Sequence, residues 1–152
     1  MYQKILVPLD GSDLAECTLS HVESLVKDGS VGEVTLLNIV KIDILWATMH
    51  EEIPVDLTET RKLLLAVSRK YLAKVASQLR SKGIKVKTES VEANRSADTI
   101  TDYAKKNGMD LIVMATHGHT GFKKLLLGSV AFGVLHESHV SVFLIRPESC
   151  RM

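Results

Sequence analysis

The chain has few of the residues that mark a specialised class of protein. Its 152 residues include only two cysteines, Cys17 and Cys150, so the sequence predicts neither a disulfide framework nor a zinc site and favours a reducing cytoplasm. No apolar run approaches the length of about 18 residues that a membrane span needs. The first ten residues lack the long apolar centre of a signal peptide. A net charge of +1 gives no reason to expect nucleic acid or a membrane as a partner.

Two common phosphate-binding motifs are also absent. The P-loop pattern G-x-x-x-x-G-K-[ST] is missing because no lysine follows Gly128. The dinucleotide fingerprint G-x-G-x-x-G is missing because Gly11 stands alone after the first apolar run. These absences exclude a conventional P-loop NTPase and a Rossmann dehydrogenase.

What the chain does contain is a strict alternation of strand-like and helix-like segments, which indicates one domain over residues 1–152. The apolar runs predict strands at residues 4–9, 34–39, 84–91, 110–115 and 141–145. The longest helical pattern between them has the apolar stripe Leu64, Val67, Tyr71, Val75 and Leu79. An earlier helix is capped by Ser12 or Asp13, and the last one begins at Gly128. The alternation predicts an α/β fold, an open parallel sheet with helices on both faces.

Two loops of this fold carry residues that suit a ligand. Parallel sheets of this kind bind ligands beyond the carboxyl ends of their strands, where the strand order reverses. Residues 8–12 follow the first strand, and residues 115–129 follow the fourth strand and lead into a helix. Glycine-rich backbone before a helix start offers N–H groups and partial positive charge to a phosphate. We therefore predict a bound phosphate group, and with it a nucleotide, between Asp10 and the glycine loop.

Two long stretches, KILVPLDGSDLAECTL at residues 4–19 and DLIVMATHGHTGFKKLLLGSVAFGVLHESHVSVFLIRP at residues 110–147, resemble the opening and closing parts of the universal stress protein family. ATP-binding members of that family carry the motif G-x2-G-x9-G-[ST]. This chain matches three of its four positions with Gly118, Gly128 and Ser129, and Ala115 replaces the first glycine. The resemblance implies a Rossmann-like fold of the adenine-nucleotide alpha hydrolase type, with five parallel strands in the order 3-2-1-4-5.

The resemblance also implies an ATP site, with magnesium bound through the phosphates. The residues at the matching positions are Pro8, Leu9, Asp10, Ile39, Met114, Ala115, Gly118, His119, Gly128, Ser129 and Val130. By this resemblance, Pro8, Leu9 and Asp10 line the adenosine pocket, and Ile39 meets the adenine. Met114 and Ala115 lie near the ribose. The phosphates are held by Gly118, His119, Gly128, Ser129 and Val130.

Several of these residues have purely structural alternatives. Residues 10–12 form a favourable turn and helix cap without any ligand. Gly118 and Gly121 are compatible with turns in an empty loop, and Lys123 and Lys124 with a solvated face. Both interpretations stay open at the level of the sequence.

The irregular segment at residues 41–56 and the histidines offer further candidates. The only tryptophan, Trp46, and the nearby Met49 suit a cover over a ligand, a subunit contact or an anchor to the core. His117 and His119 alternate in a loop, and no cysteine or acidic residue stands at zinc spacing from them. The sequence therefore predicts no metal centre, and a place for His119 beside a phosphate is favoured.

No catalytic constellation for phosphoryl transfer is visible in the sequence. Asp10 and His119 are the only candidates for acid–base chemistry, and neither ligand loop contains an arginine. We expect a stress-response signalling module that binds ATP, has at most slow hydrolysis and is read by an unidentified protein partner. The alternative is a dimeric scaffold of the same fold that binds no nucleotide. Ala115, in place of the first glycine of the motif, favours this alternative. A nucleotide-dependent transferase or ligase would need further basic residues that the loops lack.

The last predicted strand is apolar over consecutive residues. Val142, Phe143, Leu144 and Ile145 follow one another, and an exposed apolar edge strand is an association site. The family resemblance implies a homodimer in which this strand pairs antiparallel with its twin. Pro147 then ends the strand before the polar tail.

Overall fold

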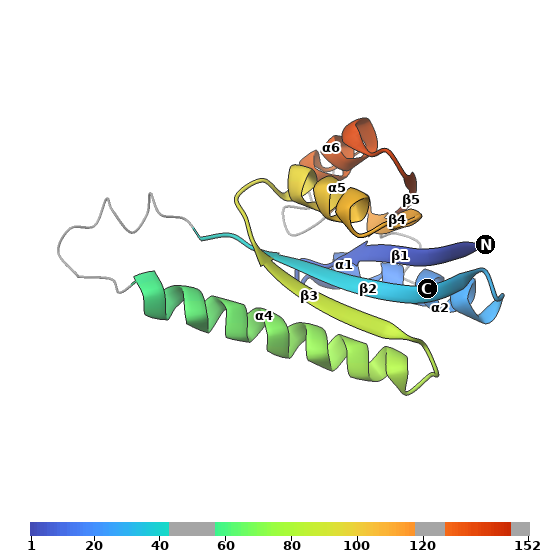
Figure 1. Ribbon diagram of the computed structural model, residues 1–152, viewed down its shortest axis with the longest axis horizontal. Helices are drawn as coiled ribbons and strands as arrows, with labels where there is room; N and C mark the ends of the chain where they lie inside the picture. Colours follow the sequence, from blue (N-terminus) through green and yellow to red (C-terminus); the bar gives the residue numbers. More distant parts are fainter. Residues whose placement is uncertain (43–56, 118–126, 147–152) are drawn as a thin grey trace.

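Strands and helices alternate along the chain, and the five strands form one parallel sheet (Figure 1). The computed structural model describes residues 1–42, 57–117 and 127–146. The elements are β1 (Tyr2–Pro8), α1 (Asp13–Glu16), α2 (Thr18–Lys27), β2 (Val31–Val40), α4 (Leu57–Arg80), β3 (Val86–Glu92), α5 (Ser96–Lys106), β4 (Leu111–Ala115), α6 (Ser129–Glu137) and β5 (Ser141–Ile145). The strand order is β3-β2-β1-β4-β5, with every neighbouring pair parallel. This confirms the predicted fold class and strand order.

Two apolar layers hold the sheet between its helices. On one face, α2 and α4 pack against the sheet through side chains such as Val22 and Leu72, and Ile5 and Val7 of β1 point into this layer. On the other face, α5 and α6 bury Ile100 and Val134 against residues that include Leu6 of β1. Alternate residues of β1 therefore serve opposite layers, as the side-chain period of a strand requires. A central strand buried on both faces explains the continuous apolar run of this segment.

The helix predicted after β1 is divided into α1 and α2 at Cys17. Ser12 caps α1, because the Ala15 N–H donates to the Ser12 Oγ at 3.2 Å. At the division, the Thr18 hydroxyl donates to the Ala15 carbonyl at 2.8 Å, and Thr18 is fully buried. The same kind of side-chain bond occurs inside the unbroken helix α5, where the Thr101 hydroxyl donates to the Ala97 carbonyl, so this bond alone does not explain the division.

The inner face of α4 differs from the predicted apolar stripe. Val75 and Leu79 are buried as expected, but Leu64 and Val67 are 38% and 65% exposed. The inner position in this part of the helix belongs to Ser68, a polar residue that an apolar pattern passes over. Figure 1 shows that α4 begins beyond the end of the sheet, so its first turns have less of the sheet to cover. No helix in the described part of the chain, α4 included, is long and apolar enough to cross a membrane.

Candidate functional site

A cavity of about 410 Å³ opens beyond the carboxyl ends of the central strands. It lies at the switch point of the sheet, where β1 is flanked by β2 on one side and by β4 on the other. Its volume is in the usual range for a small-molecule site. The lining residues are Pro8, Leu9, Asp10, Ala15, Leu37, Ile39, Lys41, Ser96, Ile100, Met114, Ala115, Thr116, His117, Gly128, Ser129, Val130 and Ala131.

The turn after β1 forms one wall of the cavity. The Asp10 Oδ1 accepts hydrogen bonds from the backbone N–H of Ser12, at 2.9 Å, and from its hydroxyl. Gly11 has a φ of +85°, a conformation that glycine adopts without strain. The turn-and-cap role that the sequence offers as an alternative for Asp10 is therefore confirmed. The same residue also lines the cavity, so the two roles coexist.

Tyr71 of α4 supports this turn from the opposite side of the sheet. Its hydroxyl donates to the Glu16 Oε1 at 2.9 Å. Burial raises the pKa of the Tyr71 hydroxyl well above its ordinary value, and the hydrogen bond to Glu16 and the charges of Glu16 and Asp10 raise it further. The backbone N–H of Gly11 acts on the same hydroxyl in the opposite direction. The tyrosine therefore stays neutral and donates its hydrogen bond to Glu16 of α1, the helix that follows this turn.

Gly128 closes the connection between β4 and α6. Its N–H donates to the Thr116 carbonyl at 2.7 Å. A Cβ at this position would lie 3.0 Å from that same carbonyl oxygen, which is closer than side chains normally approach a backbone atom. The glycine thus favours the close approach of two backbone segments, and a larger residue would push them apart by a few tenths of an ångström. Its own N–H, which the sequence suggested for a phosphate, is already bonded within the chain.

The first turn of α6 faces the cavity directly after this glycine. Ser129, Val130 and Ala131 all line the cavity, and the backbone N–H groups of a first helical turn have no partner inside the helix. Gly128 is the N-cap and supplies no side-chain bond, and the first turn has no acidic residue. Ser96, the first residue of α5, lines the same cavity. Two helix starts therefore line one space, and the start of α6 suits an anion better than that of α5, whose first turn contains Asp98.

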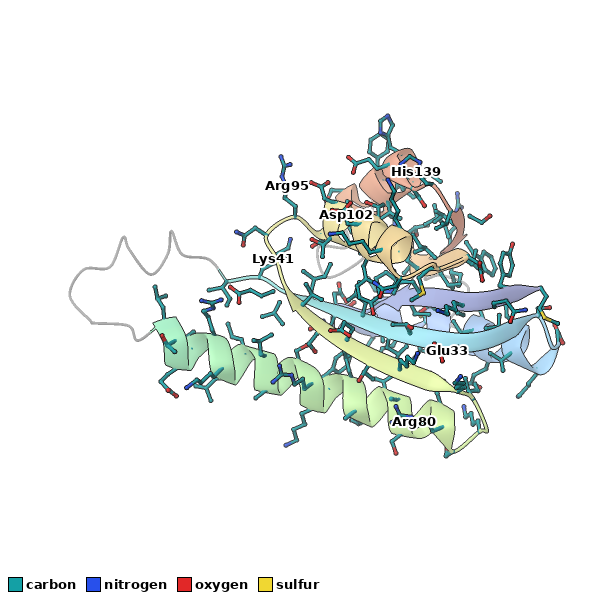
Figure 2. The ribbon with its side chains drawn as sticks, viewed as in Figure 1. Glu33, Lys41, Arg80, Arg95, Asp102 and His139 are labelled. Atoms are coloured by element: carbon teal, nitrogen blue, oxygen red, sulfur yellow. The ribbon has the colours of Figure 1, made fainter. Side chains whose placement is uncertain are left out.

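The end of β2 forms the opposite wall. Leu37 and Ile39 alternate along the strand and share the face that lines the cavity, and Lys41, directly after β2, lines the cavity as well. The pairing of β1 with β2 ends at Pro8 opposite Leu37, and the last bond of the ladder joins the Leu9 N–H to the Leu37 carbonyl at 2.8 Å. Figure 2 shows Lys41 at the opposite end of β2 from Glu33, so a cation stands at the cavity end of this strand.

The direction of the backbone groups of Ile39 follows from the ladder. Val34 and Val40 bond to the β3 side, through the Lys85 carbonyl at 2.9 Å and the Ala93 N–H at 3.1 Å. Leu37 bonds to the β1 side, so even-numbered residues serve β3 and odd-numbered residues serve β1. The N–H and C=O of Ile39 therefore point to the β1 side, where β1 has already turned away. They form a donor and acceptor pair at the wall of the cavity.

Every predicted site residue that the structure describes lines this cavity, namely Pro8, Leu9, Asp10, Ile39, Met114, Ala115, Gly128, Ser129 and Val130. Gly118 and His119 lie outside the described residues, as do Gly121, Lys123, Lys124, Trp46 and Met49. The sequence interpretation missed Ala15, Leu37, Lys41, Ser96, Ile100, Thr116, His117 and Ala131. The period of a strand connects Leu37 and Lys41 to Ile39 and is a signal that finds them. No sequence signal of that kind connects the start of α5 to the cavity.

Within the described ranges, no group of three or more histidine, cysteine, aspartate or glutamate side chains is placed to hold a metal ion. Thr116 is buried, and its hydroxyl lies 3.0 Å from the Nδ1 of His117. The histidine is therefore oriented by its neighbour at the edge of the cavity.

The fold and the crevice define the class as a doubly wound parallel α/β protein with a small-molecule cavity at its switch point. Comparison with known sequences then identifies the family. The profile of the universal stress protein family matches residues 1–146. The chain belongs to the universal stress protein family.

Two relatives come from Methanocaldococcus jannaschii. Universal stress protein MJ0531 is 32% identical over 146 residues, which cover 96% of this chain and 83% of the relative. Universal stress protein MJ0577 is 30% identical over 157 residues, with 96% of each chain covered. A solved structure of MJ0577 has a TM-score of 0.81 at 31% identity and covers 96% of each chain.

Two more distant structures share the fold. A universal stress protein in complex with cAMP has a TM-score of 0.65 at 17% identity, covering 96% of this chain and 98% of the other. A universal stress protein family protein from Arabidopsis thaliana with AMP bound has a TM-score of 0.65 at 16% identity, covering 95% of this chain and 91% of the other.

Proposed function

We propose that the cavity binds an adenine nucleotide, ATP with magnesium, and that the protein is a stress-response signalling module whose nucleotide occupancy is read by a partner protein. The observation that carries the proposal is the meeting of apolar walls, the backbone pair of Ile39 and the first turn of α6 in one cavity. The two universal stress proteins with bound AMP and cAMP support the adenine nucleotide as the ligand class. The distant pair of cysteines makes a reducing cytoplasm part of the proposal.

The backbone pair of Ile39 favours adenine over guanine. Adenine presents the acceptor N1 beside the donor N6 amino group, which together match one N–H and one C=O on a strand edge. Guanine presents the O6 acceptor and the N1–H donor in the reverse order, so both contacts would be mismatched and the polar groups left unpaired. The rings of the base would lie between apolar side chains that line the cavity, among them Leu37, Ile100 and Met114.

The first turn of α6 is proposed to hold the phosphates. Ser129 offers a hydroxyl and a backbone N–H, and Val130 and Ala131 add further N–H groups at the positive end of the helix. Magnesium fits this arrangement as an ion held mainly by phosphate oxygens and water, which is its usual mode of binding. No dedicated protein cage is needed, in keeping with the absence of an acidic cluster among the described residues.

A charge placed at the phosphate end tests the proposal. Ser129→Asp puts a carboxylate in the first turn of α6, where it favours the helix but repels phosphates. Ser77→Asp on the exposed face of α4 changes the net charge equally and lies away from the cavity. Calorimetric titration of nucleotide-free protein with ATP and magnesium should show saturable binding in the wild type and Ser77→Asp. Binding should weaken by at least about tenfold in Ser129→Asp, the equivalent of one or two lost charge-assisted bonds.

A flat titration of the folded wild type would overturn the nucleotide proposal and favour the dimeric scaffold without nucleotide. Titrations with ADP, AMP and cAMP in the same series rank the phosphate contacts, since each ligand lacks part of the triphosphate. Equal affinities for all of them would contradict the assignment of α6 to the phosphates. Hydrolysis is not part of the proposal, because no arginine is among the described residues that line the cavity.

The proposal includes a homodimer formed through β5. This strand is the last of the sheet, and Phe143 is 39% exposed on it. Val142 and Leu144 pack against the apolar layer under α5 and α6, so they position the strand, and Phe143 is the large apolar side chain that it offers outward. A partner strand paired antiparallel to β5 would cover this edge.

A further inference from the structure

The backbone hydrogen bonds between β1 and β2 end with the pair Leu9 and Leu37, although β2 continues to Val40. After the bond from the Leu9 N–H to the Leu37 carbonyl, the next bond of a parallel ladder would join the Ile39 N–H to the Leu9 carbonyl. That bond is replaced. The side-chain amide of Asn38 donates from Nδ2 to the Leu9 carbonyl at 2.7 Å. A side chain of β2 thus takes the place of a backbone group of the same strand.

The Asn38 amide is held in this orientation by a partly buried chain of hydrogen bonds. The Ser68 hydroxyl of α4 donates to the Asn38 Oδ1 at 2.6 Å. Ser68 lies 2.6 Å from the Ser90 hydroxyl of β3, which therefore acts as the donor to Ser68. Ser68, the central member of the chain, is only 5% exposed, while Asn38 and Ser90 are half-buried. With Oδ1 fixed on Ser68, the Nδ2 of Asn38 is directed at the Leu9 carbonyl.

The chain also turns away before the next bond of the ladder could form. The Ile39 C=O would accept from the Gly11 N–H if β1 continued. Gly11 instead has a φ of +85°, which breaks the extended conformation that the ladder needs. The Leu9 carbonyl is therefore occupied by a side chain of β2, and β1 ends before Gly11 can bond the Ile39 carbonyl.

We propose that Asn38 is a positioning residue, which keeps the N–H and C=O of Ile39 available to the ligand by taking the Leu9 carbonyl in their place. Leu9 is only 2% exposed, and a buried carbonyl requires a donor. Without the Asn38 amide, the nearest donor on the same strand is the Ile39 N–H itself. Closing that bond would remove the pair that reads the edge of the base. The inference rests on the proposed adenine nucleotide as ligand.

The test compares the isosteric variant Asn38→Leu with the wild type. Thr35→Val is a matched control, because it removes a buried hydroxyl from the same strand at a residue that does not line the cavity. In Asn38→Leu the affinity for ATP should fall by about tenfold, the equivalent of one lost hydrogen bond, and the preference for ATP over GTP should shrink. Thr35→Val should keep both values. Urea unfolding of each variant separates these effects from changes in stability.

Amide hydrogen exchange at Ile39 gives a readout that a merely structural role would not move. In the ligand-free wild type, this N–H should exchange rapidly and become protected when ATP binds. In ligand-free Asn38→Leu, it should already be protected by the Leu9 carbonyl. If Asn38→Leu does not fold, Ser68→Ala releases the Asn38 amide and should show the same changes to a smaller extent.

The outcomes separate this inference from the proposed function. A wild type that binds no nucleotide overturns the function, while exchange at Ile39 still tests the positioning role in the ligand-free protein. The positioning role is overturned if the wild type binds ATP and Asn38→Leu binds it with the same affinity and the same preference for ATP over GTP. Rapid exchange at Ile39 in both ligand-free proteins overturns it as well.

Discussion

Single polar residues on β2 have different tasks at its two ends. Glu33 is 7% exposed at the end away from the cavity and pairs with Lys87 of β3 and with Lys85, the residue directly before β3, each at 3.0 Å. The hydrogen bond from Lys87, followed by that from Lys85, holds the pKa of the Glu33 carboxyl below its ordinary value. Lys41 at the other end lines the cavity. β2 therefore has a partly exposed ion cluster near one end and a wall of the cavity at the other.

Glu33 makes the stability of the protein sensitive to acid. Because its pKa is lower in the folded chain, the stabilisation is present above the unfolded value near 4.5 and is lost as the pH falls through the lower folded value. Glu33→Gln should lower the free energy of unfolding at pH 7, and the difference from wild type should shrink below pH 4.5. Urea unfolding at several pH values measures this difference. Glu137→Gln, at the exposed end of α6, should show no such pattern, and a difference that stayed constant down to pH 3 would contradict the linkage.

At the level of single residues, the sequence predicts more than half of the residues that line the cavity, but it does not predict the proposed role of Asn38. Pro8, Asp10 and Ser129 lie in motifs that can be recognised along the chain. Asn38 lies inside an apolar strand and Ser68 inside an amphipathic helix, where a polar residue is simply an interruption of the pattern. Their role depends on a contact between residues 30 apart in sequence, so it becomes visible only in three dimensions.

Among the elements, α5 and α6 pack unusually closely. A Cβ at Gly133 of α6 would lie 2.7 Å from the Cβ of Ala97 in α5, a separation that real side chains do not tolerate. Ala97 stands one residue after Ser96, and α6 begins at Ser129, so the contact fixes the two helix starts that face the cavity. Small residues at the crossing thus determine the relative position of these two helix starts.

The fit between Gly133 and Ala97 can be measured with a double-mutant cycle. Gly133→Ala should lower the free energy of unfolding by about 1–3 kcal/mol, because an added methyl in a packed contact forces the helices apart. Ala97→Gly removes the methyl that it meets and costs about 1 kcal/mol of helix propensity on its own. The double variant should be more stable than the sum of the two changes predicts. Strict additivity in urea unfolding would show that the two residues do not press on each other.

The elements themselves follow well from the sequence, with departures that have local causes. Continuous apolar runs identify the buried parallel strands, and the glycines after α4 and α5 mark helix ends. The division at Cys17 was not predicted, since the apolar pattern continues across it without a break. The inner face of α4 was misassigned over its first half because the helix begins beyond the sheet there (Figure 1).

For the whole molecule, the sheet has two different edges. β3 forms one edge and is covered by α4, with Arg61 of the helix paired to Glu92 at the end of the strand at 2.8 Å. β5 forms the other edge and is short. The strand order, which the family resemblance implied, thus leaves β5 as the edge that suits association.

A charge on β5 should therefore dissociate the proposed homodimer. Phe143→Lys replaces the exposed apolar side chain of the edge strand, and lysine is a residue that natural edge strands use to prevent pairing. Leu63→Lys is the matched control, since Leu63 is 65% exposed on α4. Sedimentation velocity at micromolar concentration should show dimers for the wild type and Leu63→Lys, and monomers for Phe143→Lys. A wild-type monomer, or a Phe143→Lys dimer of unchanged affinity, would contradict the assignment.

The hydrogen bond between the Gly128 N–H and the Thr116 carbonyl joins two points that lie twelve residues apart along the chain. Each flank has an anchor of its own, since the Thr116 N–H donates to the Ile145 carbonyl and the Phe132 N–H to the Gly128 carbonyl, both at 2.9 Å. Doubling the length of a closed loop costs only about 0.6 kcal/mol. We therefore expect the free energy of unfolding to depend only weakly on the number of residues between Thr116 and Gly128.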